Sequence, residues 1–115
     1  MSITRMHTSE RMSKIVIHNG LVYLCGQVGE GANITEQTSS MLASVDALLA
    51  EAGSSKSSIL SATIWLKTMD DYDALNLVWD AWIDPDNPPA RACGESRLAT
   101  DDFLVEVIIT AAQET

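Results

Sequence analysis

The chain of 115 residues is long enough for one domain and short for two, and its 46% of apolar residues suffice for a packed core. Sixteen acidic residues outweigh seven basic ones, and the resulting formal net charge of −9 argues against broad binding to a phosphate backbone. No segment approaches the roughly 20 apolar residues of a membrane span, and the N-terminal residues lack the apolar core of a secretory signal, so we expect a cytoplasmic protein with reduced cysteines and no membrane partner.

The first half of the chain predicts a hairpin and then a helix. Residues 15–24 form two apolar segments around Asn19-Gly20, a dipeptide that tolerates the positive φ angles of a two-residue turn. After a glycine-rich loop, Asn33 with a glutamate three residues later resembles a helix N-cap. Apolar residues then recur at helical spacing as far as Gly53, which indicates a helix lying on a sheet.

The second half predicts strand, helix and two further strands. Residues 59–67 alternate between two faces as a strand does. Asp70 is the predicted cap of a second helix, whose apolar residues follow the 3.6-residue period. Residues 90–97 and 103–111 predict the last two strands, the final one nearly all apolar and therefore central. This order predicts an α+β fold in which both helices cover one face of a mixed sheet.

Arg91 is the first candidate functional residue. Two prolines stiffen the chain before it, and small alanines on either side leave space around its guanidinium. The planar fork of an arginine matches a carboxylate through two parallel hydrogen bonds. The alternative is an ordinary surface or ion-pairing arginine, because most arginines lie at the surface.

Glu106 is the second candidate, because it interrupts the apolar run 103–111. It either faces water through strand alternation or is buried and suited to acid–base chemistry. Arg91 and Glu106 lie on consecutive segments, so both could reach one cleft. Cys25 and Cys93 are more often inert core residues than reactive thiols, although Cys93 shares the strand face of Arg91.

Together the segments resemble the RidA/YjgF family of small imine deaminases and relatives (the endoribonuclease L-PSP family). The resemblance covers nearly the whole chain, as a single domain over residues 1–115. It rests on these short motifs in order: Asn19-Gly20-Leu21-Val22-Tyr23, Cys25-Gly26-Gln27, Glu36-Gln37-Thr38, Glu51-Ala52-Gly53, Asn76-Leu77-Val78-Trp79-Asp80-Ala81-Trp82, Pro89-Ala90-Arg91 and Val105-Glu106-Val107. The serine-rich segment 53–64 and the Trp-Asp-Ala-Trp run look closest to a YoaB-like branch.

The resemblance implies a chorismate-mutase-like fold, with two helices on one face of a mixed six-stranded sheet. It also implies a homotrimer with ligand clefts between subunits and no metal or organic cofactor. In such deaminases an arginine grips the substrate carboxylate and a glutamate of the last strand activates a water, roles that fall here on Arg91 and Glu106. Cys93, through its backbone, and Asn76 match further substrate-binding positions.

The chain departs from the family pattern at two substrate-binding positions. Met12 aligns with a tyrosine of the family deaminases, and Cys25 replaces a serine. Methionine cannot donate a phenolic hydrogen bond, and a thiol donates more weakly than a hydroxyl. The segment after Cys93 is also one residue shorter. The carboxylate clamp is therefore retained, while part of the polar shell on the imine side is missing.

The leading hypothesis is an enamine/imine deaminase that hydrolyses reactive small 2-imino acids, such as 2-iminobutanoate or 2-iminopropanoate, to 2-keto acids and ammonia. The alternative is a non-catalytic trimer that binds or senses small keto acids or related carboxylates. A third hypothesis, a ribonuclease or translation inhibitor, is disfavoured by the negative charge, and no nucleic-acid partner is expected.

Overall fold

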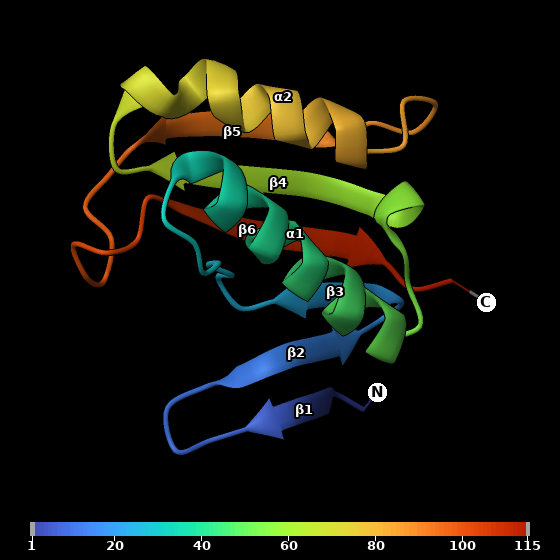
Figure 1. The fold of residues 1–115 in the computed structure, drawn as a ribbon. Coiled ribbons are helices and arrows are strands. Elements are labelled where there is room, and N and C mark those ends of the chain that lie inside the picture. Colours follow the sequence, from blue (N-terminus) through green and yellow to red (C-terminus); the bar gives the residue numbers. More distant parts are fainter. Residues whose placement is uncertain (1, 115) are drawn as a thin grey trace.

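A computed structural model describes residues 2–114, and within them six strands form one sheet in the order β1-β2-β3-β6-β4-β5 (Figure 1). Helices α1 (Ile34–Glu51) and α2 (Tyr72–Trp82) cover the same face of this sheet. The strands are β1 (Thr4–Thr8), β2 (Ser13–His18), β3 (Leu21–Leu24), β4 (Ile59–Leu66), β5 (Ala90–Glu95) and β6 (Val105–Ala112). The predicted α+β architecture is confirmed, and we call the sheet face without helices the open face.

The sheet is mixed because α2 carries the chain across from β4 to β5. These two strands are parallel, with Ala62 opposite Arg91, whereas β6 runs antiparallel to both β3 and β4. Parallel neighbours require a crossover connection, which α2 supplies. As a consequence β5 lies at the edge of the sheet, and β4 separates it from β6 although β5 and β6 are consecutive in the chain.

The predicted hairpin is confirmed, and a strand that the residue pattern did not predict extends it. Asn19 and Gly20 have φ angles of 54° and 77°, as a type I′ turn between β2 and β3 requires. β1 pairs antiparallel with β2, with Thr4 opposite Ile17. Only Met6 of β1 is partly buried, so the strand shows no apolar alternation that sequence analysis could detect.

The two helices begin differently. The Asn33 side chain accepts a hydrogen bond from the Glu36 backbone N–H at 2.9 Å, which confirms the predicted cap of α1. The prediction for α2 is wrong, because the Thr68 hydroxyl accepts the Asp70 N–H and opens a 3₁₀ turn over Met69–Asp71. The backbone N–H of Asp70 is therefore a donor within this 3₁₀ turn. Helix α2 begins after the turn, at Tyr72.

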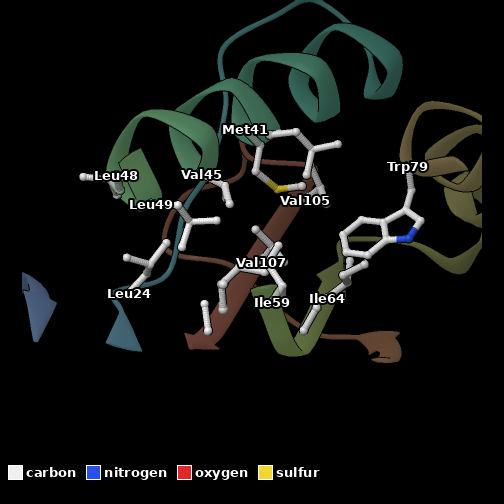
Figure 2. Close-up of a cluster of buried hydrophobic side chains, with 14 of the residues drawn as sticks. Leu24, Met41, Val45, Leu48, Leu49, Ile59, Ile64, Trp79, Val105 and Val107 are labelled. Atoms are coloured by element: carbon white, nitrogen blue, oxygen red, sulfur yellow. The ribbon is translucent and has the colours of Figure 1, made fainter. Parts of the chain in front are cut away.

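The core lies between the helices and the sheet (Figure 2). Met41, Val45 and Leu49 of α1 pack toward Val105 and Val107 of β6, and all five are fully buried. Burying a large apolar side chain stabilises a fold by about 1.5–3 kcal/mol, so this layer holds the sheet and the helices together. No helix within the described part of the chain is long and apolar enough to cross a bilayer.

Candidate functional site

Arg91 lies near the start of β5 and points to the helix-covered side of the sheet. Its strand partner Ala62 is buried against the helices, and residues opposite each other in a sheet share a face. The guanidinium carbon lies 5.3 Å from the centre of the Trp79 ring, and Nη2 donates to the Tyr72 hydroxyl at 3.5 Å. The half-buried guanidinium is therefore held by two aromatic residues of α2.

The Arg91 guanidinium has no acidic partner in the described chain. Within residues 2–114, no carboxylate oxygen lies within 4.0 Å of the Arg91 guanidinium. The salt bridge that these residues do contain joins His7 to Glu51. The interpretation of Arg91 as an ion-pairing arginine therefore does not hold for these residues. A guanidinium carries five N–H donors, so most of them stay free for a ligand.

Cys93 and Asn76 lie near Arg91 in the fold. Cys93 is opposite Ile64 and shares the face of Arg91. Burial raises the pKa of the Cys93 thiol, and the positive charge of Arg91 only partly opposes this, so the thiol stays protonated near neutral pH. Asn76 follows Tyr72 by one turn of α2, and its buried amide oxygen accepts no hydrogen bond from the described residues.

Glu106 points to the open face, opposite Trp65 of β4. Its carboxylate lies against the backbone of Gly26, where an added Cβ would come within 2.1 Å of Oε2. Position 26 must therefore lack a side chain for Glu106 to hold this conformation. The chain is fastened here by two backbone hydrogen bonds of 2.9 Å between Gln27 and Val107.

Cys25 lies beside Gly26 and Glu106, and Met12 lies in the turn that precedes β2. Cys25 precedes Gly26, and its sulfur accepts a hydrogen bond from Gln27 Nε2 at 3.2 Å. Met12 belongs to the turn between β1 and β2, and its side chain is 50% exposed. No cluster of three His, Cys, Asp or Glu residues within 2–114 has an arrangement that could hold a metal ion.

Arg91 and Glu106 do not share a cleft within one chain. β4 lies between their strands, Arg91 points toward α2, and Glu106 points to the open face. The expectation drawn from consecutive segments is wrong for the single chain, because the α2 crossover places β5 beyond β4. The candidate residues form two half-sites, one around Arg91 and one around Glu106.

Comparisons with known proteins identify the family. The family model described as endoribonuclease L-PSP matches residues 2–113. A RutC family protein of Haemophilus influenzae is 46% identical over 114 residues, covering 96% of this chain and 98% of that protein. The RutC family protein YoaB of Escherichia coli is 42% identical over 114 residues, covering 97% and 99%. A crystal structure of a YjgF family member from Neisseria meningitidis superposes with a TM-score of 0.97 at 45% identity, covering 100% of this chain and 98% of that one. The chain belongs to the RidA/YjgF family.

This RidA/YjgF-family fold contains a structural clamp that sequence analysis missed, the side chain of Gln37. It is only 4% exposed, its oxygen accepts the Leu104 N–H at 2.8 Å, and its nitrogen donates to Asp102 O at 2.9 Å and Gly31 O at 3.2 Å. The clamp ties the loop before β6 to the glycine-rich loop that precedes α1, so both chain segments around Glu106 are held. The available signal was an amide side chain within an apolar helix stripe, because a buried amide is expected to be hydrogen-bonded.

The residues that support Arg91 in this RidA/YjgF-family chain were also not predicted. The sequence predicted only an apolar stripe along α2, yet two residues of the stripe, Tyr72 and Trp79, contact the guanidinium. Their spacing of seven residues, two helical turns, places them on one side of the helix. The sequence did not indicate which strand this side of α2 would cover.

Proposed function

We propose that the protein hydrolyses small 2-imino acids to 2-keto acids and ammonia, with the substrate carboxylate held by Arg91. The observation that carries this proposal is a half-buried guanidinium that has no acidic partner among residues 2–114 and rests on the Trp79 ring. The ring holds the cation without neutralising it, and the free N–H groups can receive a carboxylate in a bidentate pair.

We further propose that the two half-sites meet between subunits of a homotrimer. Three large apolar side chains of the open face are exposed in the single chain: Tyr23, Trp65 and Ile108. Contiguous exposed apolar surface is typical of a protein–protein interface. Arg91 lies on the edge strand β5, so a copy whose open face packs across this edge would bring its Glu106 toward Arg91 of its neighbour. A light-scattering mass of three chains is expected, and a monomer would contradict the shared cleft.

In the proposed reaction, Arg91 orients the substrate, and Glu106 accepts and donates protons as a general base and acid. Glu106 removes a proton from water as the water oxygen bonds to the imine carbon. The electrons of the C=N bond move to nitrogen, which receives this proton from Glu106. Glu106 then takes the hydroxyl proton of the resulting carbinolamine and returns it to nitrogen, so that the C–N bond breaks, the carbonyl forms and nitrogen leaves as ammonia. Holding the reactants in place lowers the barrier of the first step.

The test is a trapping assay. A threonine dehydratase generates 2-iminobutanoate, semicarbazide traps it, and a family deaminase of established activity serves as positive control. The wild type is expected to lower the trapping rate. Glu106→Gln keeps the side-chain size and should lose about 10²–10⁴-fold in rate. Leu77→Ala, on the outer side of α2 where Leu77 is 74% exposed, is the matched surface control and should behave as wild type. If the wild type leaves trapping unchanged while the positive control lowers it, the deaminase proposal fails.

A second candidate function is binding of small keto acids without catalysis. Met12 favours it, because an exposed methionine offers no polar donor at a position where the family deaminases carry a tyrosine. Calorimetry with 2-oxobutanoate separates the two functions. Binding that is lost in Arg91→Ala, together with no deamination by the wild type, would assign the protein to this class. Cleavage of RNA is less well supported, because a net charge of −9 repels the phosphate backbone.

A further inference from the structure

We propose that the Tyr72 hydroxyl donates a third hydrogen bond to the carboxylate held by Arg91, and so makes the site selective for carboxylates over their neutral amides. This inference rests on the proposed carboxylate site at Arg91 and extends it to a recognition residue on α2. Tyr72 is the first residue of that helix and is 36% exposed, so its hydroxyl remains accessible to a ligand.

The existing contact between Arg91 and Tyr72 defines which proton is available. A guanidinium has no acceptor, so in the 3.5 Å contact Nη2 is the donor and the tyrosine oxygen is the acceptor. The hydroxyl hydrogen of Tyr72 then has no acceptor among the described residues. A carboxylate in front of Arg91 would supply one.

The same contact makes the hydroxyl a better donor. A hydroxyl oxygen that accepts from a cation is polarised, and its O–H bond to an anion is strengthened. A carboxylate has about four lone-pair positions, of which the arginine fork occupies two. A third donor from Tyr72 can therefore be added without competition.

The Arg91 guanidinium and the Tyr72 hydroxyl are also held in fixed positions relative to each other. Trp79, which is 4% exposed, lies under the guanidinium, and it belongs to the same helix as Tyr72. Ordering of both groups before the ligand arrives lowers the entropic cost of binding. Tyr72 would thus provide a phenolic donor on the carboxylate side of the substrate, whereas Met12 provides none on the imine side.

The experiment compares two ligands, 2-oxobutanoate and 2-oxobutanamide, by calorimetry or ligand-observed NMR on wild type, Tyr72→Phe, Arg91→Lys and Leu77→Ala. Tyr72→Phe removes only the hydroxyl and should weaken binding of the acid about tenfold, since the lost hydrogen bond has a charged acceptor. Binding of the amide should change less than about twofold. Leu77→Ala should bind both ligands as wild type, and the thermal midpoint of Tyr72→Phe should stay at the wild-type value.

The outcomes separate this inference from the proposed function. If Arg91→Lys weakens binding of the acid but Tyr72→Phe does not, the role of Tyr72 is refuted and the carboxylate site at Arg91 stands. An equal loss for acid and amide in Tyr72→Phe would indicate general packing and would also refute it. If the wild type binds no 2-oxobutanoate at all, the carboxylate site itself is wrong.

Discussion

Replacing Gly26 with alanine tests whether the position of the Glu106 carboxylate matters for the proposed hydrolysis. The new Cβ would lie 2.1 Å from Glu106 Oε2, so the carboxylate must retreat by about 1.3 Å to reach an ordinary contact of 3.4 Å. The three nearest atoms all belong to the Glu106 side chain, which can rotate, so we expect a loss of less than about 1 kcal/mol in the free energy of unfolding. A misplacement of this size near the reacting atoms can lower kcat about 10²-fold.

The assay for Gly26→Ala is the semicarbazide competition, with Glu106→Gln setting the rate without a carboxylate. Gly20→Ala is the matched control, because Gly20 has a φ of 77° and no heavy atom within 4 Å of an added Cβ. Its left-handed backbone should cost about 1 kcal/mol of stability while kcat is unchanged. Wild-type kcat in Gly26→Ala, alongside an inactive Glu106→Gln, would refute the argument that the carboxylate must sit where the structure has it. Unfolding of Gly26→Ala would show that Glu106 cannot retreat.

Three further predictions concern stability, each measured by thermal unfolding. In Gly29→Ala the Cβ would lie 2.1 Å from the backbone oxygen of Gln37, so α1 itself must shift; we expect a loss of at least about 2 kcal/mol, and an unchanged midpoint would refute the clash. Asn33→Ala removes the cap of α1 and should cost about 1 kcal/mol, whereas Asn33→Asp should keep most of it; equal losses would argue against the cap. Two serine hydroxyls lower the pKa of Glu114 below its ordinary 4.5, so its contribution is complete above that pH and is lost as the pH falls through the folded-state pKa. Glu114→Gln should therefore be less stable than wild type at pH 7, and the difference should shrink below about pH 4.5; a constant difference would contradict the linkage.

Features that depend on neighbouring residues were predictable from the sequence. The turn at Asn19-Gly20 and the cap at Asn33 rest on backbone angles and hydrogen bonds within a few residues, and both are confirmed. Predictions failed where local alternatives compete. Asp70 and Thr68 can each start a helical turn, and the structure uses Thr68. β1 has no buried face of its own, so its pattern carried no signal and only the family resemblance implied a sixth strand.

For the candidate site, too, some features were predictable from the sequence and others depended on the tertiary structure. The residue types, the apolar periods and the family motifs by themselves determined the family, the α+β fold and the importance of Arg91 and Glu106 as positions to test. Only the tertiary structure decided that these two residues face opposite sides of the sheet. The physical reason is that the α2 crossover and the burial of apolar faces against the helices set strand order and side-chain direction. These are long-range contacts, and no local spacing between residues 91 and 106 encodes them.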